Sequence, residues 1–314
     1  MSDLYQAYKS CTLCPRECRV DRTAGRLGIC GESAELRIAS IEAHFGEEPP
    51  ISGTRGSGTL FFSGCTLLCS FCQNYQISCL HIGDCTTVEK AADQVADLVQ
   101  RRGIHNLNLV TPDHFLPHAI DLIQRLRARG IALPVVFNSS GFEKVELLRQ
   151  TEEYVDIYLP DFKYSDAELA HALSHCRSYP LVALDAITEM VKQKGFLDHF
   201  TEGRAIASRG VLVRHLVLPG QTANSIAALS MLFAEFGPEL PLSLMSQYRP
   251  ARMVKQAELN RPLWPEEFGR VYDHLLELGF KNCFVQYMEG SPEEEEEPFL
   301  PDFNRERPFK GNLR

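Results

Sequence analysis

The sequence of 314 residues has no apolar stretch near the roughly 20 residues that a bilayer-spanning helix needs. Its first residues, MSDLYQAYKSC, lack the apolar run of a secretory signal. It also has no excess of basic charge, because 41 acidic residues outnumber 32 basic ones and the net charge is −9. An acidic chain has no general attraction for nucleic acid or anionic membranes. We therefore expect a cytoplasmic protein with neither nucleic acid nor membrane as partner.

A nucleotide fingerprint is missing as well. Gly53, Gly56 and Gly58 are spaced somewhat like a phosphate-binding loop, but they precede a predicted strand rather than follow one. An oxidoreductase on a doubly wound fold needs a glycine-rich turn from strand to helix, and the sequence offers none. Internal repeats and coiled-coil heptads are absent too.

Cysteine, by contrast, is abundant, with 11 residues in the chain. In a reducing cytoplasm, clustered cysteines bind metal or do chemistry more often than they form disulfides. Cys176 and Cys283 stand alone and are predicted to be buried small hydrophobic residues. The others form two groups: Cys11, Cys14, Cys18 and Cys30, then Cys65, Cys69, Cys72, Cys79 and Cys85.

The composition changes twice along the chain. Residues 1–55 are rich in cysteine, glycine and arginine with little periodicity, which predicts a small cysteine-rich N-terminal module. Residues 56–290 alternate strand-like and helix-like segments and are predicted to form the main domain. Residues 291–314 begin with the charge run SPEEEEEPF, which is typical of a solvated linker. We predict an acidic linker there, followed by a tail that is either disordered or draped over the core.

Apolar, β-branched runs in the main domain predict strands, and amphipathic segments between them predict helices, the first capped by Thr86 or Thr87. Strands are expected at 59–63, 106–110, 134–138, 155–159, 211–218, 240–245 and 281–286, and helices at 87–102, 117–129, 143–150, 223–236 and 265–278. Such alternation implies an α/β fold of parallel strands joined by right-handed crossovers. A partial or full parallel β/α barrel is the prediction, with a flat doubly wound sheet as the alternative.

A cysteine motif follows the first of these strands. Cys65, Cys69 and Cys72 lie in CTLLCSFCQNY, a Cys-x3-Cys-x2-Cys spacing that no fourth cysteine continues at once. Four thiolates normally hold an iron–sulfur cluster, so three leave one iron open to a substrate or cofactor. The carboxyl end of a strand is also where β/α barrels build active sites. The alternative is a structural zinc loop completed by Cys79 or Cys85.

This spacing, with Phe71 inside it, resembles the signature of the radical S-adenosylmethionine (SAM) superfamily. The aromatic face of Phe71 could pack on a flat ring such as adenine. The longer stretch GCTLLCSFCQNYQIS is similar to proteins related to pyruvate formate-lyase activating enzyme. Other stretches extend the resemblance over nearly the whole chain: CTLCPREC, EEPPISG, GSGTLFFSGC, LVTPDHF, YLPDFKY, RHLVLPG and SLMSQYRP.

The resemblance implies a radical SAM barrel in which the open iron of a 4Fe–4S cluster chelates SAM. One electron then cleaves SAM to methionine and a 5′-deoxyadenosyl radical, which abstracts hydrogen from a substrate. A low-potential electron donor, ferredoxin or flavodoxin, is implied as partner. Likeness to activating enzymes favours a protein or peptide substrate, with a small molecule as the alternative. A non-catalytic iron–sulfur or zinc protein is the hypothesis from another class, and it predicts no cleavage of SAM.

The resemblance also implies cofactor contacts at the ends of other predicted strands. Asp161 and Lys163 resemble the Asp-x-Lys motif of activating enzymes, and Lys163 is a compact cation suited to a methionine carboxylate. At 111–114 the chain has Thr-Pro-Asp-His where many members have a Gly-Gly-Glu stretch, so Thr111 or backbone is expected to replace that contact. The remaining predicted contacts are Asn138, Ser139 and Ser140, near the ribose, and Arg214, Gln247 and Tyr248.

The N-terminal cysteines predict a second metal site. Cys11, Cys14, Cys18 and Cys30 supply four thiolates, enough to close a tetrahedral site, and a Cys-x2-Cys arm is a common chelating unit. The segment has few apolar residues and can hardly fold without such a staple. Zinc and a second iron–sulfur cluster both fit four thiolates, and structural zinc is slightly favoured because a closed site leaves no position for chemistry.

Overall fold

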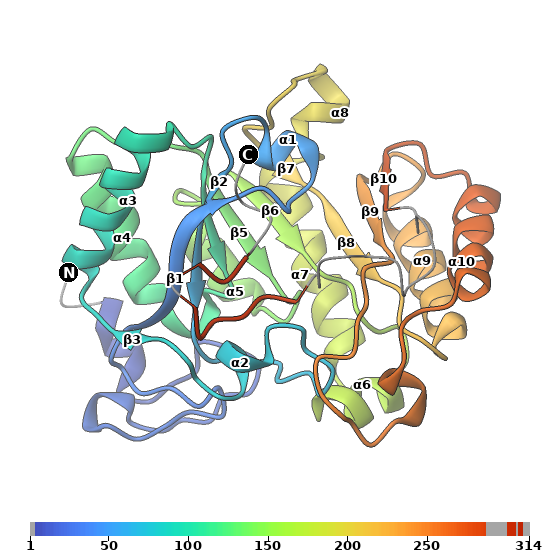
Figure 1. Ribbon diagram of the computed structural model, residues 1–314, viewed down its shortest axis with the longest axis horizontal. Helices are drawn as coiled ribbons and strands as arrows, with labels where there is room; N and C mark the ends of the chain where they lie inside the picture. The colour runs from blue at the N-terminus through green and yellow to red at the C-terminus, as the bar shows by residue number, and fades with distance from the viewer. Residues whose placement is uncertain (1–3, 287–299, 306, 310–314) are drawn as a thin grey trace.

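The computed structural model describes residues 4–286, 300–305 and 307–309. Its centre is a curved, mainly parallel sheet flanked by helices (Figure 1). Seven strands are hydrogen-bonded in the order β3 (Asp84–Cys85), β1 (Arg37–His44), β2 (Ser57–Phe62), β4 (Leu107–Val110), β5 (Val135–Ser139), β6 (Ile157–Pro160) and β7 (Gly210–Val211). The pairs from β2 to β7 are parallel.

A second, smaller sheet lies next to the seven-stranded one. It contains three parallel strands, β8 (Val213–Leu216), β9 (Leu242–Met245) and β10 (Cys283–Val285). The amide of Phe162, just after β6, donates to the carbonyl of Arg214 at 2.8 Å, and a parallel bridge joins Asp161 to Arg214. The two sheets therefore form one arc of parallel strands, which confirms the barrel prediction against the flat sheet. The run predicted as one strand at 211–218 is split into β7 and β8.

The predicted helices are present. They are α3 (Val88–Arg102), α4 (Leu116–Ala128), α5 (Val145–Thr151), α9 (Thr222–Phe236) and α10 (Pro265–Leu278). Thr87 is the N-cap of α3, since its hydroxyl accepts the amide of Lys90 at 3.2 Å. The short helices α1 (Pro49–Ser52), α2 (Tyr75–Ser78), α6 (Ala167–Ser174) and α8 (Asp198–Glu202) and the long α7 (Tyr179–Lys194) were not predicted. A search for helical spacing would have found α7, because Ala183, Ala186, Ile187 and Met190 form its buried face.

The N-terminal segment is joined to the sheet. β1 runs antiparallel to β2, with partners from Ile38 and Phe62 to His44 and Ser57. The dark blue cysteine loops that precede β1 lie at the end of the barrel where the chain leaves β2 (Figure 1). The division near residue 55 stays a prediction. No helix within the described residues is long and apolar enough to cross a membrane.

The C-terminal segment crosses the open face of the arc, where it is drawn in red in Figure 1. Phe303 is buried and lies edge-on to Phe61 of β2, with ring centroids 5.5 Å apart. Phe309 packs on Phe61 at 5.3 Å and on His44 at 4.4 Å. The described part of the tail is therefore draped over the barrel, one of the two predicted outcomes. The predicted acidic linker at 291–299 lies outside the described residues.

Candidate active site

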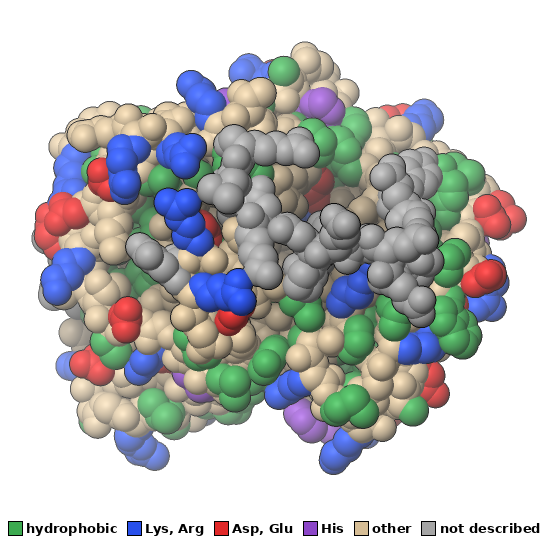
Figure 2. Space-filling view, viewed as in Figure 1, with side chains coloured by type: hydrophobic (Ala, Val, Ile, Leu, Met, Phe, Trp, Pro, Cys, Tyr) green, Lys and Arg blue, Asp and Glu red, His purple; other side chains and the backbone are tan. Residues whose placement is uncertain are grey.

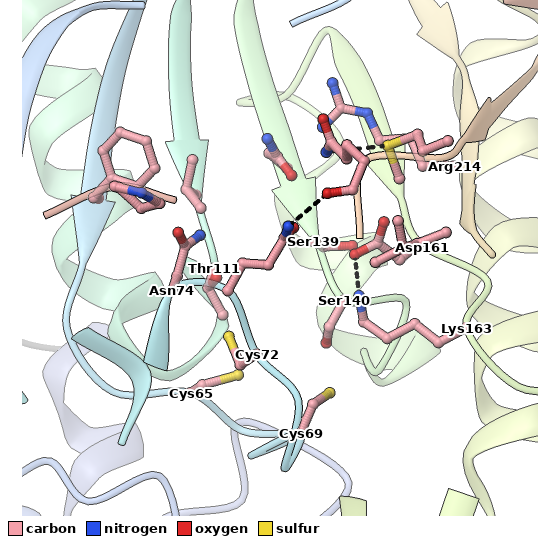
Figure 3. A pocket seen from close by; sticks show the side chains of 18 of the residues that line it. Cys65, Cys69, Cys72, Asn74, Thr111, Ser139, Ser140, Asp161, Lys163 and Arg214 are labelled. Carbon is pink, nitrogen blue, oxygen red and sulfur yellow. Dashed lines mark hydrogen bonds and ion pairs between the residues drawn. The ribbon is translucent and has the colours of Figure 1, made fainter. Parts of the chain in front are cut away.

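A cavity of about 280 Å³ opens at the carboxyl ends of the parallel strands. Its residues come from the end of β1 and the loop after it, from β2 and the loop after it, from the ends of β4, β5, β6, β8 and β9, and from the C-terminal segment. Figure 3 shows the cysteine loop below and the ion-paired side chains of β6 and β8 opposite it. Most of the predicted site residues are thus brought together: Cys65, Cys69, Phe71, Cys72, Thr111, Asn138, Ser139, Ser140, Asp161, Lys163, Arg214 and Gln247.

The cysteine loop starts at a glycine that no other residue can replace easily. Gly64 has φ +80°, and a Cβ there would lie 2.8 Å from the carbonyl oxygen of Cys30. This turn lets Cys65 leave the strand toward the cavity, close to the N-terminal cysteine loops. Leu68 also takes a left-handed φ, +58°, so the backbone curls between the first two cysteines.

All three cysteines of the loop are free thiols. Burial raises the pKa of Cys65 well above its usual value, with Cys69 and Cys72 adding to the rise, and it raises the pKa of Cys72 to about 11. The Cys65 and Cys72 thiols are therefore protonated at neutral pH, so a bound metal has to displace their protons. Three cysteines from one loop line the cavity, and three is the number of thiolates that would leave one iron of a 4Fe–4S cluster open.

Asp161 and Lys163 face the cavity from the end of β6, where Figure 3 shows them ion-paired. Burial alone would lower the pKa of Lys163, but Asp161 and the nearby Cys69 and Cys72 outweigh burial and raise it. Lys163 therefore stays charged beside the cysteines. The hydroxyl of Tyr179 fixes this turn, since it accepts the amide of Lys163 and donates to the carbonyl of Asp161, both at 2.9 Å.

Residues 111–114, which follow β4, differ from the Gly-Gly-Glu stretch named above, but Thr111 adopts a backbone conformation typical of glycine. Thr111 has φ +55°, a region that β-branched residues avoid, and its amide donates to the carbonyl of Asn138 at 2.8 Å. On β5, the Ser139 hydroxyl donates to Glu143 at 3.0 Å. Ser140 lines the cavity, and its hydroxyl is buried and has no hydrogen-bond partner among the described residues.

The sequence reasoning missed two acidic residues. Glu47 and Glu48 both form ion pairs with Arg214 of β8, and Glu47 lines the cavity. Glu47 accepts the side-chain amides of Asn108 at 2.7 Å and Asn138 at 3.4 Å. Burial tends to raise the pKa of Glu47, but Arg214 outweighs it, so the carboxylate stays ionised. The stretch EEPPISG contains both glutamates, but nothing in it points to a partner on β8.

Two predicted aromatic contacts have different outcomes. Phe71 lines the cavity, and its ring packs edge-on against Tyr164 and Tyr248 at 6.3 Å each. Tyr248 is not among the residues that line the cavity, because it is buried beside Phe71 with its hydroxyl donating to the carbonyl of Leu259 at 2.6 Å. The position of Tyr248 therefore gives no support to a contact with the cofactor.

The N-terminal cysteine segment contacts the cysteine loop at Cys30, whose carbonyl accepts the amide of Cys65 at 3.4 Å. A side chain at Gly28 would lie 3.1 Å from the sulfur of Cys30 and 3.5 Å from that of Cys18. Burial raises the pKa of Cys14 to about 12, with small contributions from Cys30 and Cys11. Within residues 4–286 and the described part of the tail, no three His, Cys, Asp or Glu side chains form a group that could hold a metal ion. Both metal assignments therefore stay proposals.

These features define an α/β barrel with a thiol-lined cavity at the carboxyl ends of its strands. The family model of the radical SAM superfamily matches residues 59–232, which include the cysteine loop and the strand ends from β4 to β8. The chain belongs to the radical SAM superfamily. Membership implies an enzyme of radical chemistry that binds SAM and a 4Fe–4S cluster.

One relative is an uncharacterized protein, MJ0674, of Methanocaldococcus jannaschii, which is 27% identical over 272 residues, 85% of this chain and 74% of the relative. Among solved structures, the chain is similar to native anSMEcpe with bound AdoMet and Cp18Cys peptide at 11% identity and a TM-score of 0.45, covering 70% of this chain and 60% of that one. It is similar to Streptococcus suis SuiB bound to S-adenosylmethionine at 12% identity and a TM-score of 0.47, covering 75% of this chain and 52% of that one. The chain thus spans between half and two thirds of these two structures.

Proposed function

We propose that the protein binds a 4Fe–4S cluster through Cys65, Cys69 and Cys72 and reductively cleaves SAM in the cavity above them. The observation that carries the proposal is that three free thiols and the Asp161–Lys163 pair line the same cavity. When bound, the cluster supplies one electron to SAM, whose cleavage yields methionine and a 5′-deoxyadenosyl radical that takes hydrogen from a substrate.

The chain's own residues bind and orient SAM. Lys163 presents a permanent positive charge to the methionine carboxylate, and Asp161 holds its ammonium group in place. The free Ser140 hydroxyl and the backbone at Thr111 offer further polar contacts. Phe71 provides an apolar wall for the adenine. The C-terminal segment, through Phe309, covers part of the cavity and limits the entry of water.

Anaerobic purification and reduction with dithionite test this proposal. The protein should carry a cluster and release 5′-deoxyadenosine from SAM, and each of Cys65→Ala, Cys69→Ala and Cys72→Ala should abolish both. Cys176→Ala is the matched control, because Cys176 is as buried as Cys69, its sulfur contacts the Ser178 hydroxyl, and it does not line the cavity. Cluster-replete protein that neither binds nor cleaves SAM would mean a non-catalytic iron–sulfur protein.

For the substrate, we propose a protein or peptide, on the basis of the resemblance to activating enzymes. A radical at a glycine Cα is one product consistent with that chemistry, although the Thr-Pro-Asp-His stretch at 111–114 argues against a true pyruvate formate-lyase activator. A small molecule is the second candidate. The cavity of about 280 Å³ is small, and Pro301 and Phe309 of the C-terminal segment form part of its wall. Deuterium transfer into 5′-deoxyadenosine from labelled cell protein, compared with labelled metabolites, separates the two.

Two partners complete the proposal. Ferredoxin or flavodoxin supplies the electron, and replacing dithionite by either reduced protein should sustain 5′-deoxyadenosine release. The N-terminal cysteines hold a second metal, zinc by slight preference or an auxiliary iron–sulfur cluster. Metal analysis separates zinc from a cluster when it is done on the protein with Cys65, Cys69 and Cys72 all replaced. About one zinc per chain indicates the zinc site, and about four irons indicate the auxiliary cluster.

A further inference from the structure

A buried arginine lies beside the N-terminal cysteines without a carboxylate partner. The side chain of Arg22 is 1% exposed and lies near the rings of Tyr8, at 4.5 Å, and Phe115, at 5.4 Å. Its guanidinium donates to the carbonyls of Ser33, at 2.7 Å, and His114, at 2.6 Å. None of the ion pairs formed by the described residues includes it. A charge removed from water in this way needs an opposite charge nearby.

Glu32 and Asp121, two buried carboxylates in this part of the fold, have other cationic partners. Glu32 pairs with His81 at 2.8 Å and with Arg37 at 3.4 Å. Asp121 pairs with Arg125 at 2.9 Å and accepts the hydroxyl of Tyr5. The group that Arg22 does approach is a sulfur, because its Nη1 lies 3.8 Å from the Sγ of Cys11.

A protonated thiol cannot balance this charge, but a thiolate can. Cys11, Cys14, Cys18 and Cys30 as free thiols would leave the guanidinium uncompensated. Four thiolates on Zn²⁺, or on an oxidised 4Fe–4S cluster, form a dianion. We propose that these cysteines form an anionic metal–thiolate centre and that Arg22 is its internal counter-cation.

The same centre supports the catalytic loop. The amide of Cys65 donates to the carbonyl of Cys30 at 3.4 Å. Arg16, which follows Cys14 by two residues, donates to the carbonyls of Thr66 at 3.0 Å and Leu67 at 3.1 Å. The N-terminal metal therefore fixes the backbone on which the catalytic cysteines are carried. Its removal should reduce occupancy of the catalytic cluster, whereas the reverse is not expected.

The inference refines the second metal site and does not depend on the radical chemistry. Its test uses the full chain with Cys65→Ser, Cys69→Ser and Cys72→Ser, so that any metal found belongs to the N-terminal cysteines. We expect about one zinc or about four irons per chain, lost on further replacement of Cys14 by serine. A metal-free protein overturns the inference. In that event the catalytic cluster can still be present on the parent protein, so the two failures are distinguishable.

The role of Arg22 is tested by metal release to a chelator in the same background. Arg22→Gln should weaken metal binding about 10- to 100-fold, the range found for groups that support metal ligands, and Arg22→Lys should weaken it less. Arg16→Gln is the matched control, because the four described hydrogen bonds of the Arg16 side chain all go to backbone carbonyls and none goes to a cysteine sulfur. Equal losses for Arg22→Gln and Arg16→Gln would show that Arg22 is only a backbone clamp.

A double-mutant cycle covers the case in which Arg22→Gln folds poorly. With the metal removed through Cys14→Ser, the guanidinium has no counter-charge, so Arg22→Met should cost less thermal stability than it does in the metal-bound protein. A backbone clamp predicts the same loss of melting temperature in both backgrounds, and that result would overturn the assignment.

Discussion

Asp113 and Glu143 are two buried carboxyl groups that interact in the interior of the protein, and the presence of Asp113 adds to the rise in the pKa of Glu143. Both are buried, and they lie between the Thr66 hydroxyl, which donates to Asp113, and the Ser139 hydroxyl, which donates to Glu143. Burial raises the pKa of Asp113 to about 7 and that of Glu143 well above its usual value. The pair therefore holds a proton at neutral pH, directly behind the cysteine loop.

This pair predicts a pH dependence of stability. The unfolded chain ionises Asp113 near its usual pKa of 3.8, whereas the folded chain keeps the proton up to about 7. The free energy of unfolding should thus fall as the pH rises from about 4 to about 7. Asp113→Asn should flatten this slope and stabilise the protein by about 2 kcal/mol at pH 8, measured by urea unfolding. Asp198→Asn, at a buried carboxylate bonded to Ser208 and Arg204, should destabilise instead.

Lys163 is predicted to bind SAM. Lys163→Ala should weaken SAM binding by about 2–5 kcal/mol, the usual cost of losing one partner of a buried charge pair, while the cluster spectrum is unchanged. Isothermal titration of anaerobic, cluster-loaded protein measures the affinity. Lys144→Ala is the control, because Lys144 pairs with Glu17 at 2.6 Å and does not line the cavity. Equal affinities of the two variants for SAM would show that Lys163 does not bind the cofactor.

The left-handed backbone at Thr111 separates two ways of contacting SAM. Thr111→Gly should stabilise the fold by about 1 kcal/mol, because glycine adopts a positive φ without strain. Thr111→Val keeps the branched shape and the strain but loses the hydroxyl. If the backbone makes the contact, both variants bind SAM like the parent protein. A loss of affinity in both would assign the contact to the hydroxyl.

The two glutamates that share Arg214 should differ in their contribution to stability. Glu47→Ala removes a buried charge and leaves the amides of Asn108 and Asn138 without an acceptor, so it should cost about 3–5 kcal/mol. Glu48→Ala leaves Arg214 paired with Glu47 and should cost less. Thermal unfolding of both variants tests the order. A larger effect for Glu48→Ala would contradict the central role of Glu47.

Local patterns in the sequence were sufficient to predict the main strands and helices of the fold. Strand and helix periodicity predicted the parallel arc and its main helices, because each buried face repeats along a continuous segment. The Cys-x3-Cys-x2-Cys spacing predicted the cysteine loop, since its three cysteines lie within eight consecutive residues. Tyr248 was misplaced in the expected site because the sequence cannot tell which side of a loop residue faces a cavity and which faces the core.

The sequence by itself thus determined the family, the barrel and the loop that carries Cys65, Cys69 and Cys72. Only the tertiary structure decided which distant residues meet: Glu47 with Arg214, Asp113 with Glu143, and Arg22 with Cys11 and His114. The physical reason is that packing the strands into one arc brings together residues that no local pattern relates. In the first pair two opposite buried charges form an ion pair, and in the second a buried carboxyl group keeps its proton. At Arg22 the structure leaves a buried positive charge without a carboxylate partner among the described residues, and this is the basis of the proposed metal–thiolate centre.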